Sequence, residues 1–252
     1  MFIPCKLVIL ILALTLDGQV HTGENIGGRE AVPHSRPYMV LLKRHMQDGK
    51  TLWCGGFLLN EDFVMTTAHC QARSYTVFLG VHNFRESNGV QRIRAEQAFP
   101  HKDYNSTSRE NDIMLLKLSS KVDFSKNVKP IALADRDDDF LPESCSISGW
   151  GRTDRETQYM SLVLVEADVT LIVDEWCQRG NFYCSEGETG PSEGDSGGSL
   201  VCEDGKAYGV VSFTLKPNSG GPFIHGYTKI ADRRRQIDLT NDASKGSYYC
   251  QI

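Results

Sequence analysis

The chain has 252 residues, 40% of them apolar, and a formal net charge of −5. Its length and apolar content allow one large domain or two domains of ordinary size. The acidic balance argues against a nucleic acid partner, and the basic run from Arg233 to Arg235 is expected to be solvated surface.

Residues 1–22 are predicted to be a secretory signal. Lys6 precedes an apolar run from Leu7 to Leu16, which suits a signal sequence and is too short to span a bilayer. No later stretch is long and apolar enough to cross a membrane. We therefore expect a secreted protein that does not insert into a membrane.

The residues after this signal predict an all-β protein. Short apolar and β-branched runs alternate with clusters of Gly, Asn, Asp and Ser, a pattern typical of a barrel or sandwich. These runs include Tyr38 to Leu42, Gly56 to Leu59, Phe63 to Thr67, Thr76 to Leu79, Ile113 to Leu118, Leu162 to Leu171 and Tyr208 to Phe213. Only Ile230 to Leu239 has helical spacing, and residues 241–252 form a polar tail.

Two polar segments are expected on the surface. The stretch from Pro130 to Pro142 is the best candidate for a connection between two halves of similar size. The triplet Asn105-Ser106-Thr107 is an acceptor sequence for N-glycosylation in a secreted chain.

Cysteine usage indicates an oxidising compartment. Of the eight cysteines, Cys5 lies in the predicted signal, so seven remain. This odd number suggests three disulfides and one unpaired thiol, which we assign to Cys250 in the polar tail. No Cys or His spacing is typical of a metal site, so no metal is expected.

Three local signatures carry residues suited to acyl transfer. A serine hydroxyl is a poor nucleophile at neutral pH, so it needs a base, a group that orients the base, and donors for the oxyanion. His69 ends an apolar strand beside Cys70, and Asp112 starts a strongly apolar strand. Ser196 lies among glycines in Gly194 to Gly198, which leave the backbone free to turn its N–H groups toward a carbonyl.

In the order His, Asp, Ser, these signatures resemble the trypsin and chymotrypsin family and differ from the order in subtilisins and α/β-hydrolases. The resemblance extends from Ile26 to about Leu239 and includes Ile26-Gly27-Gly28, which looks like the activation site. It implies two six-stranded antiparallel β-barrels with a short C-terminal helix, and an active site in the cleft between the barrels. It also implies a serine endopeptidase that needs no cofactor, with residues 25–240 as the peptidase domain.

The resemblance further implies three disulfides. They are Cys54 with Cys70, Cys145 with Cys202, and Cys177 with Cys184. The bridge that many members place across the substrate pocket is missing, which is the pattern of granzymes and mast-cell chymases. Gly23-Glu24 matches the two-residue propeptide of that subgroup, which a granule dipeptidyl peptidase removes. We therefore expect a secreted or granule-stored protease whose partners are peptide or protein substrates, this activator and protease inhibitors.

Each residue's expected role follows from the same resemblance. His69 is the base for Ser196, and Asp112 holds the imidazole tautomer. The N–H groups of Gly194 and Ser196 form the oxyanion hole. Asp195 pairs with the amino terminus that activation releases.

The residue expected at the amino terminus after activation differs from the one usual in the family. Active members usually begin with Ile or Val at the position held here by Asn25. An amide in the apolar pocket for this side chain forfeits about 1.5 to 3 kcal/mol of apolar burial. Cleavage after Asn25 instead would free Ile26, one residue short of the usual reach.

The expected substrate pocket departs as well. Its floor is Gly190, so the carboxylate that trypsin uses to bind Lys and Arg is absent. Thr214 stands at the neck, where Gly is common, and Ser212 stands beside the buried aspartate. His225 is expected at the back wall and could favour acids, whereas Glu193 at the rim would repel them. We expect small or medium apolar side chains to be preferred.

Two other interpretations stay open at this point. A granule protein with the protease fold that binds without cutting is the main alternative, favoured by Asn25 and Thr214 and opposed by the complete triad. A secreted β-barrel with chance motifs is the weaker one.

Overall fold

Six antiparallel strands close the first barrel, in the order β2-β3-β4-β7-β6-β5. The structure is a computed structural model that describes residues 27–135, 141–218, 220–233 and 237–238. The strands are β2 Met39–His45, β3 Thr51–Leu58, β4 Phe63–Thr66, β5 Ser74–Leu79, β6 Gln91–Pro100 and β7 Met114–Leu118. Along β5 every second side chain is buried, as expected when alternate residues of a strand face the barrel interior.

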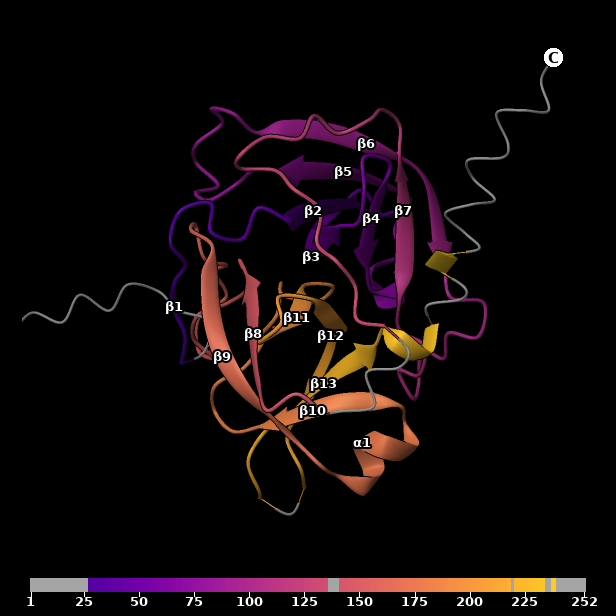
Figure 1. The fold of residues 1–252 in the computed structure, drawn as a ribbon, viewed down its shortest axis with the longest axis vertical. Coiled ribbons are helices and arrows are strands. Elements are labelled where there is room, and N and C mark those ends of the chain that lie inside the picture. Colours follow the sequence, from indigo (N-terminus) through magenta and orange to yellow (C-terminus); the bar gives the residue numbers. More distant parts are fainter. Residues whose placement is uncertain (1–26, 136–140, 219, 234–236, 239–252) are drawn as a thin grey trace, which may run out of the picture.

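The second barrel is closed by the pairing of β8 with β9. Its strands follow the order β9-β10-β13-β12-β11-β8, and the short β1 is added outside β9. The strands are β1 Arg29–Glu30, β8 Ser144–Gly149, β9 Val165–Ile172, β10 Phe182–Glu186, β11 Ser199–Cys202, β12 Ala207–Leu215 and β13 Ile224–Lys229. In Figure 1 the first barrel is drawn in indigo to magenta, and the second barrel lies below it, mostly in orange to yellow.

Each barrel has its own apolar core, and a third cluster joins them. Val40, Leu116 and neighbours fill the first barrel. Ile147, Tyr227 and neighbours fill the second. The joining cluster brings Phe57 of β3 together with residues of β11 and β12. Because each fully buried side chain of this size contributes about 1.5–3 kcal/mol, this cluster holds the two barrels firmly against each other.

Little helix is present among the described residues. Helix α1, Glu175–Arg179, begins after Asp174, whose carboxylate accepts a hydrogen bond from the Cys177 N–H. This helix was not predicted, because five residues are too few for helical periodicity to show in the sequence. The two 3₁₀ turns are η1, Ala68–Cys70, and η2, Ala231–Arg233. The expected helix from Ile230 to Leu239 lies partly outside the described residues; η2, Ile237 and Asp238 fall within it.

The predicted fold of two six-stranded barrels is confirmed. The three predicted disulfides are present: Cys54–Cys70, Cys145–Cys202 and Cys177–Cys184. The segment from Pro130 to Pro142, proposed as the connection, falls between the last strand of the first barrel and β8, with residues 136–140 outside the described part. The signal, the propeptide and the tail with Cys250 also lie outside the described residues. No helix in the described ranges is long and apolar enough to span a membrane.

Candidate active site

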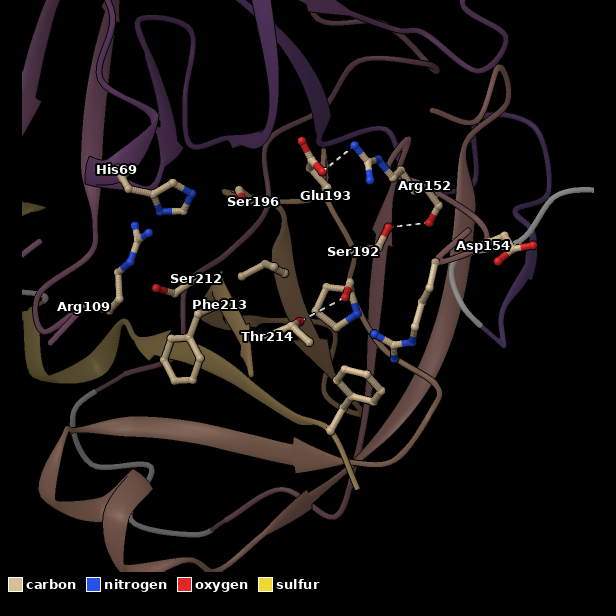
Figure 2. Close-up of a pocket in the computed structure, with 14 residues that line it drawn as sticks. His69, Arg109, Arg152, Asp154, Ser192, Glu193, Ser196, Ser212, Phe213 and Thr214 are labelled. Atoms are coloured by element: carbon tan, nitrogen blue, oxygen red, sulfur yellow. Dashed lines mark hydrogen bonds and ion pairs between the residues drawn. The ribbon is translucent and has the colours of Figure 1, made fainter. Parts of the chain in front are cut away.

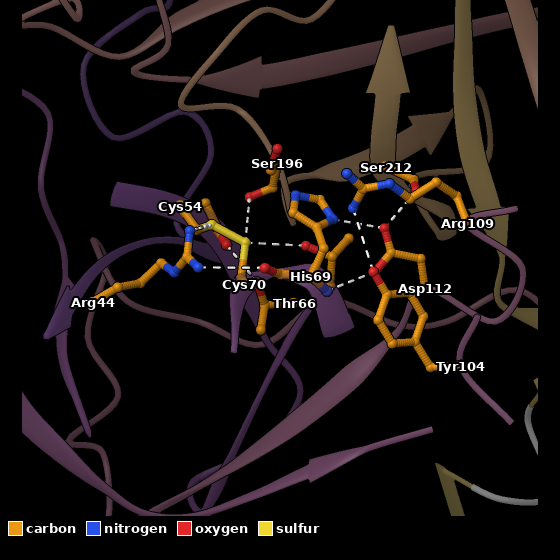
Figure 3. A network of polar contacts seen from close by, with 12 residues as sticks. Arg44, Cys54, Thr66, His69, Cys70, Tyr104, Arg109, Asp112, Ser196 and Ser212 are labelled. Carbon is orange, nitrogen blue, oxygen red and sulfur yellow. Dashed lines mark hydrogen bonds and ion pairs between the residues drawn. A yellow bond between two sulfur atoms is a disulfide. The ribbon is translucent and has the colours of Figure 1, made fainter. Parts of the chain in front are cut away.

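His69 lies on the turn η1, directly after β4 of the first barrel. The disulfide of the adjacent Cys70 ties this turn to Cys54 on β3. Arg44 of β2 reaches it from the barrel interior, donating from Nη2 to the carbonyls of His69 at 3.3 Å and Gln71 at 3.0 Å. The backbone of this turn is thus held by a disulfide and by a buried arginine, both drawn in Figure 3.

Three donors converge on the carboxylate of Asp112, which is completely buried. Oδ1 accepts a hydrogen bond from the backbone N–H of His69 at 2.8 Å. Oδ2 lies 2.6 Å from His69 Nδ1 and accepts from Ser212 Oγ at 2.6 Å. A carboxylate held by three donors fixes the ring orientation and places the proton of a neutral imidazole on Nδ1, leaving Nε2 free to accept. This network is drawn in Figure 3.

Ser196 lies at the junction of the two barrels. Its carbonyl accepts a hydrogen bond of 2.7 Å from the N–H of Gly55 on β3. Gly194 has a φ of 106°, a left-handed conformation that favours glycine and turns the following peptide groups. The N–H groups of Gly194 and Ser196 donate to no described residue, as donors for an oxyanion should.

Ser196 and His69 border the same open cavity, of about 450 Å³. Figure 2 shows Ser196 on one side of the imidazole and Ser212 below it. His69 and Ser196 therefore meet at one cavity although they lie on different elements, and the buried Asp112 contacts the imidazole without lining that cavity.

Asp195, next to the serine, does not line the cavity. Its side chain is buried, and its oxygens accept hydrogen bonds from the N–H groups of Gly151 at 2.7 Å and Ser192 at 2.9 Å. Burial raises the pKa of Asp195 to about 6 despite these bonds. No cation among the described residues pairs with it, and Asn25 and Ile26 lie outside those residues.

The predicted pocket residues divide into two groups. Ser212 and Thr214 line the open cavity together with Pro191, Val211 and Phe213. The other two, Gly190 and His225, are not among the residues that line it. The fully buried ring of His225 packs so closely on Gly190 that a Cβ built there would meet ring atoms at 2.4 to 2.5 Å.

Thr214 connects the lining of the cavity to the buried His225 through a hydrogen bond. Thr214 Oγ1 lies 2.9 Å from His225 Nδ1 and 3.1 Å from the Pro191 carbonyl, while His225 Nε2 lies 3.2 Å from the Gly187 carbonyl. Burial lowers the pKa of His225. A neutral ring and one hydroxyl supply two protons for these three contacts, so the uncharged form makes two of the bonds at a time.

Charged side chains surround the cavity, and most of them were not predicted. Glu193, expected at the rim, forms an ion pair of 2.6 Å with Arg152. Arg155 lies 3.6 Å from Glu188 and stacks on Phe223. The sequence gives no local signal for these pairs because each joins residues more than 30 positions apart. Among the described residues, no group of His, Cys, Asp or Glu could hold a metal ion.

Comparison with known proteins agrees with this architecture. The family model described as Trypsin matches residues 25–237. The chain therefore belongs to the trypsin family of serine proteases, and it is a serine endopeptidase.

Within this family the chain is similar to granzymes. It is 40% identical to "Granzyme B(G,H)" of Mus musculus, an alignment that covers 95% of this chain and 100% of the relative. It is 38% identical to cathepsin G of Homo sapiens, over 82% of this chain and 84% of the relative. A solved structure of GrC matches with a TM-score of 0.76 and 35% identity, over 86% of this chain and 99% of the other. The predicted likeness to granzymes is confirmed, while the residue roles stay predictions.

Proposed function

We propose that this protease cuts peptide bonds with Ser196 as nucleophile, His69 as base and Asp112 as the group that orients the base. The observation that carries this proposal is the convergence of three donors on buried Asp112, with His69 and Ser196 bordering one cavity. Because the Asp112 carboxylate is held against the imidazole, its negative charge stabilises the imidazolium that forms during the reaction.

The reaction has two balanced steps. Ser196 Oγ attacks the scissile carbonyl carbon and gives its proton to His69 Nε2. The carbon–nitrogen bond then breaks, and the leaving amine takes that proton. Water, deprotonated by the same nitrogen, then hydrolyses the ester and restores the serine. The N–H groups of Gly194 and Ser196 stabilise the negative oxygen in both steps.

The primary pocket is proposed to favour small or medium apolar side chains. Thr214 and the buried His225 ring fill the space above Gly190, which leaves little depth for a large ring. A substrate Lys or Arg would find no carboxylate there, and burying an unpaired cation is costly. Specificity is therefore non-tryptic.

Activation is proposed to require the removal of Gly23-Glu24 by a dipeptidyl peptidase. The amino group released at Asn25 would pair with Asp195, whose buried carboxylate has no described cationic partner. This pairing would order the adjacent oxyanion hole. The proposed protease is secreted or stored in secretory granules. Its proposed partners are protein or peptide substrates and protease inhibitors.

Labelling with a fluorescent organophosphonate tests this function, because only an assembled triad and oxyanion hole react readily. We expect the protein with its terminus at Asn25 to be labelled. Ser196→Ala should keep the fold, lose the label and lose peptide hydrolysis by several orders of magnitude. A folded protein that is never labelled would support the alternative, a homologue that binds without cutting, which Asn25 and Thr214 favour. Turnover retained in Ser196→Ala would remove Ser196 from the nucleophile role.

A further inference from the structure

Arg109 lines the cavity beside His69 and has no acidic partner among the described residues. The other two arginines of the cavity, Arg152 and Arg155, each lie within ion-pair distance of a glutamate. Arg109 instead donates from Nη1 to the neutral hydroxyl of Tyr104 at 3.3 Å. One arm of the guanidinium is therefore held in place while its charge is left without a counterion.

The charged groups near Arg109 do not supply this counterion. Glu110, its neighbour in the chain, accepts a hydrogen bond from Ser108 Oγ at 3.1 Å and forms no ion pair with Arg109. The carboxylate of Asp112 is occupied by its three donors. Figure 2 shows the guanidinium of Arg109 pointing into the cavity, next to the His69 ring and above Ser212.

The backbone of Arg109 has a φ of 62°, a left-handed conformation that is unfavourable for a residue with a side chain. Asn111, two positions on, has a φ of 57°. Strained residues of this kind persist where the surrounding structure holds them, and they cluster at functional sites. The conformation agrees with a side chain that is held in the cavity.

The geometry of an extended substrate identifies which of its side chains would meet Arg109. The scissile carbonyl carbon must lie within reach of Ser196 Oγ, and the proposed primary pocket places the side chain just before it against Thr214 in the same cavity. In an extended chain, successive side chains point to opposite sides. The side chain one position earlier therefore points away from Thr214, toward His69 and Arg109.

We propose that Arg109 binds an acidic side chain on the substrate residue that immediately precedes the one in the primary pocket. This inference rests on the proposed function, because it requires a peptide in the cleft. A guanidinium presents paired N–H groups that match both oxygens of a carboxylate, and charge-assisted bonds of this kind are strong. The residue in the primary pocket stays apolar, so the acid requirement belongs to a second position of the substrate.

The test uses four fluorogenic tetrapeptides with valine in the primary position and Glu, Gln, Ala or Lys in the position before it. We expect kcat/KM for Glu to exceed that for Gln by about tenfold, and the ratio to shrink as salt screens the charges. Arg109→Met and Arg109→Gln should both bring the Glu-to-Gln ratio close to one, and Arg109→Glu should favour Lys. Two neutral variants guard against one that fails to fold.

Arg155→Met is the matched control, because it removes a cavity arginine that already has a glutamate partner. It should keep the Glu-to-Gln ratio of the parent enzyme. Turnover with equal rates for Glu and Gln would overturn this inference alone. A Glu preference that survives Arg109→Met would overturn it too. No labelling by the organophosphonate and no turnover of any peptide would remove the proposed function, and this inference with it.

Discussion

The Arg44 guanidinium donates a hydrogen bond of 3.3 Å to the carbonyl of His69, and it does so from inside the first barrel. Arg44 is only 9% exposed and forms no ion pair with a described residue. Its Nε is buried without a hydrogen-bond partner there. Burial lowers the pKa of Arg44, which measures the cost of keeping this cation in the barrel. Carbonyl groups of the histidine turn are the main acceptors that offset this cost.

Arg44→Met should therefore affect catalysis more than stability. Loss of two anchors lets the imidazole shift, and small displacements of a catalytic group are expensive, so kcat should fall about tenfold or more with a smaller change in KM. The free energy of unfolding should change by no more than about 2 kcal/mol, because the variant also removes a poorly compensated buried charge. Steady-state kinetics and urea unfolding measure the two effects. Arg44→Lys should recover part of kcat, and an unaltered kcat in Arg44→Met would contradict the anchoring role.

Thr214→Gly should widen the primary pocket. Removing the side chain takes away the methyl group and the hydroxyl that bridges Pro191 and His225, so peptides with an aromatic residue in the pocket should improve about tenfold relative to those with alanine. Thr214→Ser is the control, since it keeps the bridging hydroxyl and should change the ratio less. The ratio of kcat/KM values for matched peptides is the measurement. If it stays constant in Thr214→Gly, the neck of the pocket is elsewhere.

The buried carboxyl of Asp195 predicts how the unprocessed chain depends on pH. Its pKa of about 6 lies above the value of about 3.9 expected in the unfolded chain, so the folded form binds more protons between these values. Its contribution to the free energy of unfolding is full below about pH 4 and is lost as pH rises through 6, by about 3 kcal/mol. Urea unfolding of a Ser196→Ala precursor, with and without Asp195→Asn, isolates this contribution. A pH slope that is the same in both proteins would show that Asp195 does not titrate in this range.

Removal of the residues before Asn25 should abolish this loss of stability with rising pH. Once the amino group at Asn25 is free to pair with Asp195, the carboxylate form is stabilised and the loss between pH 4 and 6 should disappear. The same unfolding experiment on the processed Ser196→Ala protein measures it. A processed protein that keeps the slope of the precursor would show that the terminus does not reach Asp195.

Asn25→Ile should raise activity by roughly tenfold or more without changing substrate preference. With Asn25 as the terminus, the ordered form loses roughly 2 to 4 kcal/mol relative to a disordered one, because an amide replaces an apolar side chain in its pocket. A difference of this size turns an active majority into a minority and lowers apparent affinity by the competent fraction. N-terminal sequencing of the natural protein must come first, since a chain beginning at Ile26 removes the premise. No gain in the Ile variant would contradict this explanation.

Strands that carry a continuous apolar run were predictable, and short or more polar strands such as β10, β11 and β13 were not, although they are largely buried. The apolar runs of β4 and β7 are buried along almost their whole length, and the sequence located both to within two residues. Strand β6 was missed because nearly all of its side chains are at least partly exposed and its sequence is polar. This strand is positioned by its hydrogen-bonded pairing with the neighbouring strands β5 and β7.

Some residues of the candidate site were also predictable from the sequence, and others were not. His69, Asp112 and Ser196 lie in local motifs that can be found without a structure. Arg44 and Arg109 gain their significance from contacts and positions that no neighbouring residue indicates, such as a carbonyl 25 residues further along the chain. The depth of the primary pocket also depended on where the His225 ring packs.

The contact between Gly190 and His225 restricts how this enzyme could evolve toward cutting after basic residues. Introducing a carboxylate at position 190 requires a Cβ where the imidazole ring now lies, and that ring is fully buried and bonded at both nitrogens. Asp at this position alone would disrupt the pocket before it could bind a new substrate. A smaller residue at position 225 must come first or at the same time. The two positions are therefore epistatic, and a mutational route to tryptic specificity cannot change position 190 before position 225.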